Sequence, residues 1–193
     1  MEIINDKRVE KTLSRLRIAF TMLAMERNFD EITVFDLCKE AKVQRATFYT
    51  HFKDKMDFTA YAIKCAHKEL GESVQKNLDS ANPIDFLIRY IECGMAFIDS
   101  KDAMYKHVCE SASFPAICAI IADYTRESLA LNVEAARKIG LKLPADLDTT
   151  VTFVNAGLTY TVLNWLRKRP PPTDSLFGEL RLLLGKIFEC EKD

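Results

Sequence analysis

The chain has 193 residues, of which 48% are hydrophobic and 28% are charged, and this balance excludes a disordered chain. The net charge of −1 hides an asymmetry, because residues 1–55 carry 11 basic and 9 acidic side chains whereas the remainder carries 16 and 19. Glycine and proline are few, with 6 of each. Apolar residues recur at spacings of three and four almost throughout, so we expect an all-α fold.

The cysteines and the apolar stretches indicate the compartment. The six cysteines form no Cys-x-x-Cys pair, which favours free thiols in a reducing cytoplasm. The charged N-terminus lacks the apolar run of a signal peptide, and no stretch approaches the roughly 20 apolar residues of a membrane span. We therefore expect a cytoplasmic protein with no membrane partner and no cofactor.

The apolar pattern predicts nine helices. The first spans about residues 8–27, and its buried stripe consists of Val9, Leu13, Leu16, Phe20 and Leu23. Two short helices follow within residues 33–55. Asn82 as a cap and Pro83 in the first turn begin the fifth helix, and Gly140 closes the seventh. The longer elements are expected at residues 53–77, 84–99, 101–110, 115–139, 146–168 and 174–190, with Pro170, Pro171 and Pro172 before the last.

Residues 33–55 have the pattern of two short helices joined by a tight turn. Thr33 and Asp36 are spaced as a capping box, in which the hydroxyl accepts from a free amide of the first turn. The second helix begins near Arg45, with Phe48 and Phe52 facing inward. Its outer face carries polar and basic side chains, and such a face suits the major groove of DNA.

This stretch resembles the DNA-binding signature of the TetR family of bacterial transcription regulators. The resemblance covers about the first 60 residues, and the residues that carry it are Val43, Arg45, Ala46, Thr47, Tyr49, His51, Phe52 and Lys55. It implies a helix-turn-helix DNA-binding domain at residues 1–53 and a helical effector-binding and dimerisation domain at residues 54–193. It also implies a homodimer that forms through the last two helices.

The turn departs from the family pattern at two positions. Lys42 stands where the family usually has glycine, and a left-handed backbone costs a side chain about 1 kcal/mol. Gln44 stands where a better N-cap such as serine or asparagine is common. Both departures predict a turn that is less tight than usual.

We expect Arg45, Thr47 and Thr50 to contact bases, with Arg45 reading guanine through two hydrogen bonds. Tyr49, His51 and Lys55 are expected at phosphates. The full set of expected DNA-binding residues is Thr33, Gln44, Arg45, Ala46, Thr47, Tyr49, Thr50, His51, Lys53 and Lys55. The basic residues near the start of the first helix (Lys7, Arg8, Lys11 and Arg15) are also in reach of the DNA backbone, although such charges more often form a solvated face.

The last two predicted helices are apolar on more than one face. The residues concerned are Val151, Val154, Leu158, Val162, Trp165, Leu176, Leu180, Leu183, Leu184 and Ile187. Surplus apolar surface of this kind suits an intermolecular four-helix bundle, and the alternative is the core of a monomer. In a dimer, two recognition helices meet half-sites roughly 34–36 Å apart on a near-palindromic operator.

An apolar cavity with a few polar groups in the middle helices fits a small lipophilic or aromatic effector. The candidate ligand-binding residues are Phe97, Tyr105, His107, Phe114, Tyr124, Phe153, Asn155 and Tyr160, although aromatic residues at helical spacing are more often core. We therefore expect a repressor whose affinity for DNA depends on such an effector. The alternative is a DNA-binding protein that acts through a protein partner with no small-molecule ligand.

Sequence motifs of enzymes are missing, including the nucleophile elbow, the zinc-protease pair and the phosphate-binding glycine loops. His107 and Glu110 share a helix face next to Cys109, which leaves a metal site or a Cys-His pair open. No third ligand follows at a readable spacing, so we expect neither an enzyme nor a metal site.

Overall fold

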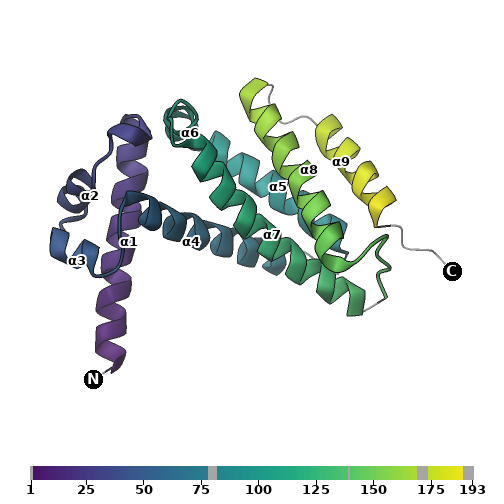
Figure 1. Ribbon diagram of the computed structural model, residues 1–193, viewed down its shortest axis with the longest axis horizontal. Helices are drawn as coiled ribbons and strands as arrows, with labels where there is room; N and C mark the ends of the chain where they lie inside the picture. The colour runs from purple at the N-terminus through teal and green to yellow at the C-terminus, as the bar shows by residue number, and fades with distance from the viewer. Residues whose placement is uncertain (1, 78–81, 139, 169–173, 189–193) are drawn as a thin grey trace. The chain divides into compact units, whose positions relative to one another are not determined.

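The computed structural model describes residues 2–77, 82–138, 140–168 and 174–188. These residues form nine α-helices and one short 3-10 helix (Phe29–Glu31), and none of them lies in a strand (Figure 1). The helices are α1 (Glu2–Glu26), α2 (Val34–Ala41), α3 (Arg45–Tyr49), α4 (Lys55–Lys76), α5 (Pro83–Asp99), α6 (Asp102–Cys109), α7 (Phe114–Lys138), α8 (Leu147–Lys168) and α9 (Asp174–Ile187).

The predicted all-α fold is confirmed, with one clear difference in helix bounds. Helix α1 begins at Glu2 rather than near residue 8. The start of α5 is as expected, because the Asn82 side chain accepts a hydrogen bond from the Ile84 amide at 2.9 Å. Gly140 follows α7 with a φ of 109°, a left-handed value that suits glycine. The predicted proline run at residues 170–172 lies outside the described residues.

The chain divides into two compact units. The head unit comprises residues 1–65 and 98–118, and the body unit comprises residues 66–97 and 119–193. Helices α4, α5 and α7 each continue from one unit into the other. In this grouping α6 and the first part of α4 cluster with the head, while a functional boundary between residues 53 and 54 stays a prediction.

Aromatic side chains fill the core of the head unit. Phe29, Phe48 and Phe58 are fully buried. The Phe20 ring meets the rings of Phe29 and Phe58 edge to face, with centroids 6.0 and 5.7 Å apart. Each pair of this kind contributes about 0.5–1.5 kcal/mol beyond the burial of its area. The cluster joins α1, α3 and α4, so it holds the short helix α3 in place.

Three hydrogen bonds attach the segment that contains α6 to the rest of the head unit. The His107 ring donates from Nδ1 to the carbonyl of Ala24 at 3.1 Å, which satisfies one of the last carbonyls of α1. The Asp30 carboxylate accepts from the Ala112 amide at 2.6 Å and from the Ser113 hydroxyl at 2.5 Å. Asp30 therefore places a negative charge at the N-terminal end of α7.

The body unit has a separate aliphatic core built from α5, α7, α8 and α9. Helices α8 and α9 lie side by side (Figure 1) and share that core through Val154, Leu158, Leu180 and Leu184. In the described part of the chain, no helix is both long enough and apolar enough to cross a membrane.

Candidate nucleic-acid interface

The capping box at the start of α2 is present as predicted. The Thr33 hydroxyl accepts from the Asp36 amide at 3.1 Å and donates to the Asp36 carboxylate at 2.6 Å. The Asp36 carboxylate also accepts from the Thr33 amide at 3.0 Å. These hydrogen bonds with Thr33 lower the pKa of Asp36 and fix the start of the helix-turn-helix.

The turn between α2 and α3 is closed in spite of its lysine. Lys42 adopts a left-handed conformation with φ 53° and ψ 46°. Its amide donates to the Lys39 carbonyl at 3.2 Å, and the Val43 amide donates to the Cys38 carbonyl at 2.9 Å. The prediction of a looser turn is therefore wrong. Gln44 forms no side-chain cap, as expected from its residue type.

Helix α3 buries one side chain and presents most of the others. Phe48 is fully buried, whereas Arg45, Ala46 and Tyr49 are exposed. The Arg45 guanidinium lies 5.9 Å from the centroid of the Tyr49 ring, which is a cation–π arrangement. The two residues are about one helical turn apart. This arrangement holds the guanidinium on the outer face, where a base edge can meet its fork of donors.

The other expected contact residues have different surroundings. The Thr50 hydroxyl donates to the Thr47 carbonyl at 2.7 Å, so its proton is used within the helix. Thr47 is half-buried and faces α1. His51 and Lys53 are exposed just after α3.

Lys55 is turned toward the protein. Its ammonium donates to the Phe29 carbonyl at 2.7 Å and lies 4.2 Å from the centroid of the Phe29 ring. Burial lowers the pKa of Lys55, and the nearby Asp30 carboxylate partly opposes that shift. The ammonium thus joins α4 to the 3-10 helix of the head, a contact that the sequence pattern did not indicate.

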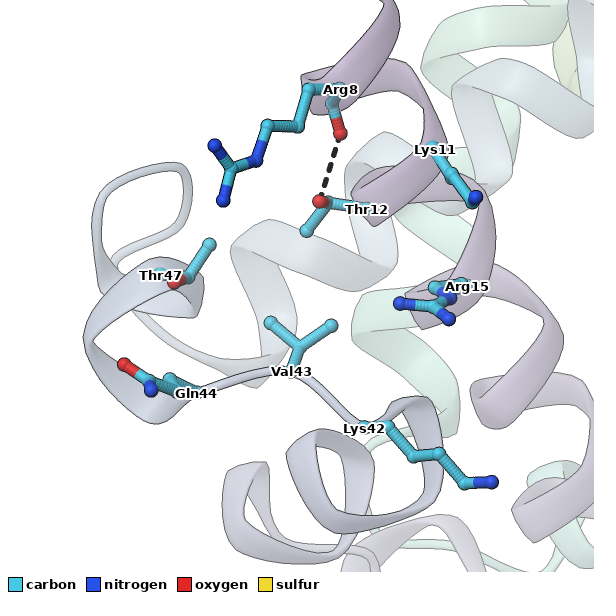
Figure 2. Close-up of a pocket in the computed structure, with 8 residues that line it drawn as sticks. All are labelled: Arg8, Lys11, Thr12, Arg15, Lys42, Val43, Gln44 and Thr47. Atoms are coloured by element: carbon cyan, nitrogen blue, oxygen red, sulfur yellow. Dashed lines mark hydrogen bonds between the residues drawn. The ribbon is translucent and has the colours of Figure 1, made fainter.

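A hollow of about 500 Å³ separates α1 from the α2–α3 turn. Figure 2 shows the two walls, with the α1 side chains on one and the turn residues on the other. We call it the basic hollow, and the residues that line it are Arg8, Lys11, Thr12, Arg15, Lys42, Val43, Gln44 and Thr47. The sequence signal was the spacing of three and four between the basic residues of α1, which places them on one helix face.

The candidate ligand-binding residues are divided between the units. Tyr105, His107 and Phe114 belong to the head unit, and the other five belong to the body unit. Of those five, Phe97, Phe153 and Tyr160 are 51%, 71% and 69% exposed. Within the described ranges, no group of three His, Cys, Asp or Glu residues is arranged to hold a metal ion.

A partly buried polar cluster in the body unit was not foreseen. The His67 ring on α4 is hydrogen-bonded through Nδ1 to the Tyr90 hydroxyl on α5. Its centroid lies 6.3 Å from the ring of Tyr124 on α7. Burial lowers the pKa of His67 and raises that of Tyr90, so both groups are neutral at pH 7. Three residues on three different helices leave no local signal in the sequence.

Comparisons with known proteins agree with this geometry. Residues 19–61 match the family model described as "Bacterial regulatory proteins, tetR family". The uncharacterized HTH-type transcriptional regulator YxbF of Bacillus subtilis (strain 168) is 27% identical over 94 residues. That alignment covers 48% of this chain and 24% of the relative, so the chain matches about a quarter of that relative's length.

Solved structures resemble the fold over nearly its whole length. A TetR transcriptional regulator from Rhodococcus sp. RHA1 has a TM-score of 0.66 at 17% identity, covering 95% of this chain and 98% of that one. RolR in complex with resorcinol has a TM-score of 0.66 at 15% identity, covering 96% and 91%. At such identities the likeness shows the fold. Residues 19–61 thus match the TetR family of bacterial regulatory proteins, and the chain has the fold of solved TetR regulators.

Proposed function

We propose that this protein is a transcriptional repressor that binds a near-palindromic operator as a homodimer. The observation that carries the proposal is the outer face of α3, where Arg45 and Tyr49 are exposed on a helix held by a buried aromatic core. The family and the fold are those of regulators and not of enzymes. Base edges in the major groove offer the acceptors that the Arg45 guanidinium needs.

The dimer is supported by the surface of the last two helices. Phe153 and Tyr160 are seven residues apart on α8 and share one face of the helix. Leu182 and Leu183 on α9 are 65% and 61% exposed, although their neighbours Leu180 and Leu184 are buried. Two adjacent helices with apolar side chains on both the core side and the outer side suit a four-helix bundle between two copies.

The effector is supported by the cluster of His67, Tyr90 and Tyr124 in the body unit. A neutral histidine hydrogen-bonded to a tyrosine supplies polar groups among aromatic rings, which is the composition of sites for small organic ligands. Asn155 adds a buried amide that donates to the Ala122 carbonyl at 3.0 Å, and no partner for its Oδ1 is found in the described residues. We infer an aromatic or lipophilic effector with a hydroxyl group, of the class to which the resorcinol of RolR belongs.

The decisive experiment is selection of bound duplexes from a random DNA pool at moderate salt, followed by sequencing. A recovered near-palindrome with two half-sites supports a dimeric sequence-specific regulator and provides the operator for an effector screen. A folded, dimeric protein that enriches no sequence, with or without phenolic compounds, would contradict the proposal. Retained operator binding in the presence of every compound would instead favour regulation through a protein partner.

A further inference from the structure

The outer face of α1 carries a second stripe of side chains at helical spacing. It repeats the pattern of the predicted buried stripe two residues further along the chain, and its members are Lys11, Arg15, Ile18, Met22 and Met25. All five are exposed. Steps of four and three residues keep these side chains on one face of the helix. We call this face the outer stripe of α1.

The middle of the outer stripe is apolar. Ile18, Met22 and Met25 are 59%, 48% and 40% exposed. Among the described residues of the head unit, the other exposed large apolar side chains are Phe35 on α2 and Tyr49 on α3. Exposed apolar side chains that are grouped in this way are typical of a surface that another molecule covers, and methionine adapts its shape to such a partner.

Opposite charges lie at the two ends of this apolar centre. Lys11 and Arg15 precede it, one turn apart on α1 (Figure 2), and Glu26 follows it. Arg15 and Glu26 lie along the same edge of the helix, because they are separated by about three full turns. Within the described residues, neither of these two makes an ion pair inside the chain. The face therefore changes from basic through apolar to acidic along the helix.

A face with this order of charges is complementary to itself when two copies meet antiparallel. A two-fold axis between Ile18 and Met22 places Ile18 of one copy opposite Met22 of the other. The same axis places Arg15 opposite Met25 and beside Glu26, so the arginine stem packs while its guanidinium meets a carboxylate. Steps of four and three residues are also those of a coiled-coil seam, in which side chains of one helix fit between those of the next.

We propose that the outer stripe of α1 binds the outer stripe of α1 in a second copy of this protein. The contact lies in the head unit, so it is separate from the bundle of α8 and α9 proposed above. A partner of a single charge sign fits less well, because it would oppose either Arg15 or Glu26 with a like charge.

The size of the stripe sets the strength of the contact. Three apolar side chains from each copy bury less than the roughly 800 Å² per partner of a stable interface. The contact should therefore be weak between free molecules. It should become strong where two dimers are held side by side, as on neighbouring operators, because tethering raises the effective concentration.

Sedimentation of the free protein at rising concentration tests this contact without DNA. Wild type should associate beyond the body dimer. Ile18→Glu should raise the dissociation constant of that second step about tenfold or more, because it places a carboxylate against the apolar centre of the other copy. Glutamate is a better helix former than isoleucine, so the melting temperature should not fall. Phe35→Glu is the matched control, since Phe35 is 58% exposed on α2, and it should leave both steps unchanged.

A charge-reversal pair tests the antiparallel register. Arg15→Glu and Glu26→Arg should each raise the dissociation constant of the second step roughly threefold, because each brings like charges together at both ends of a two-fold contact. The double variant restores the pair with its signs exchanged, so it should associate within about twofold of wild type. A role of either residue in folding alone would not produce this recovery.

The outcomes separate this contact from the proposed function. A wild type that never associates beyond the dimer, with Ile18→Glu forming the same dimer, would overturn the assignment of a second copy to this face. Larger species that Phe35→Glu removes and Ile18→Glu keeps would overturn it as well. If Ile18→Glu converts a dimer into a monomer, the α1 contact stands and the bundle of α8 and α9 is refuted. Sequence-specific DNA binding is measured independently, by the selection from a random pool.

Discussion

Single side chains decide how α3 can read DNA. Arg45 is the basic side chain of this helix, and the Tyr49 ring supports its guanidinium at 5.9 Å. A supported guanidinium loses less side-chain entropy when it meets a base than a freely rotating one. Base specificity should therefore depend on Arg45. Tyr49 should contribute by holding the Arg45 guanidinium in position.

Arg45→Ala should remove base discrimination worth roughly 1–3 kcal/mol at one operator position. The variant should still bind DNA, because Lys53 and the basic residues of α1 remain. Selection from a random pool and titration against operators with single base changes would show a relaxed preference at that position. A variant that keeps the wild-type preference at every position would remove Arg45 from the reading surface.

Lys55 makes a contact within the head that its residue type alone did not predict. Its place after the recognition helix predicted a phosphate contact, but the ammonium donates to the Phe29 carbonyl at 2.7 Å. Lys55→Ala should therefore lower the free energy of unfolding by about 1 kcal/mol, less than is usual for a charged hydrogen bond because the lysine is only half-buried. Urea denaturation measures this change.

Lys53→Ala is the matched control, since Lys53 is exposed and two residues away. It should leave stability within experimental error. If Lys55→Ala unfolds like wild type but weakens binding to all DNA sequences alike, the phosphate contact is the main role of Lys55.

At the scale of helices, local rules predicted the capped starts of α2 and α5, but neither the start of α1 nor the distant contacts. Thr33 and Asp36 are three residues apart, and Asn82 precedes Pro83, so both caps were evident from sequence. Asp30 contacts Ser113 across 83 positions. Such a pair becomes neighbours only through the packing of α1 against α6, which no periodicity encodes.

Asp30→Asn should destabilise the head, because the carboxylate lies at the N-terminal end of α7. The expected loss at pH 7 is about 0.5–1 kcal/mol, the range for an exposed charge at a helix end. The hydrogen bond from Ser113 is the largest cause that lowers the pKa of Asp30 below its usual 3.8. The contribution is therefore present above the usual pKa of 3.8 and is lost as the pH falls through the lower folded-state pKa.

Denaturation of wild type and Asp30→Asn at pH 7 and at pH 3 tests this linkage. The difference in stability between the two proteins should shrink at the lower pH. Glu31→Gln removes a neighbouring exposed carboxylate and should cause no such difference. A difference between wild type and Asp30→Asn that is equal at both pH values would show that the charge of Asp30 does not stabilise the contact.

For the whole molecule, the sequence predicted the type of secondary structure better than the packing of the helices. The all-α class and the helix-turn-helix followed from apolar spacing and from residues 33–55, because both patterns are local. The eight candidate ligand residues were chosen by type, and type does not reveal which side of α8 faces α9. Val154 and Leu158 pack into the body core, whereas Phe153 and Tyr160, on either side of that pair in the sequence, are exposed.

The exposed face of α8 carries the prediction for the assembly. Phe153→Asp should place a charge in the bundle between two copies and weaken the dimer by about 2 kcal/mol or more, roughly a 30-fold rise in its dissociation constant. Sedimentation measures that constant directly. The variant should also bind the near-palindromic operator more weakly, while a single half-site should bind as it does to wild type, because each head keeps its own contacts.

Leu131→Asp is the control for the general effect of a surface charge, since Leu131 on α7 is 74% exposed, as much as Phe153. It should leave the dimer and the operator affinity unchanged. If Phe153→Asp stays fully dimeric while Leu131→Asp dissociates, α7 and not α8 forms the interface. If both variants stay dimeric, neither face joins the two copies, and the spacing of the half-sites must be set by another part of the chain.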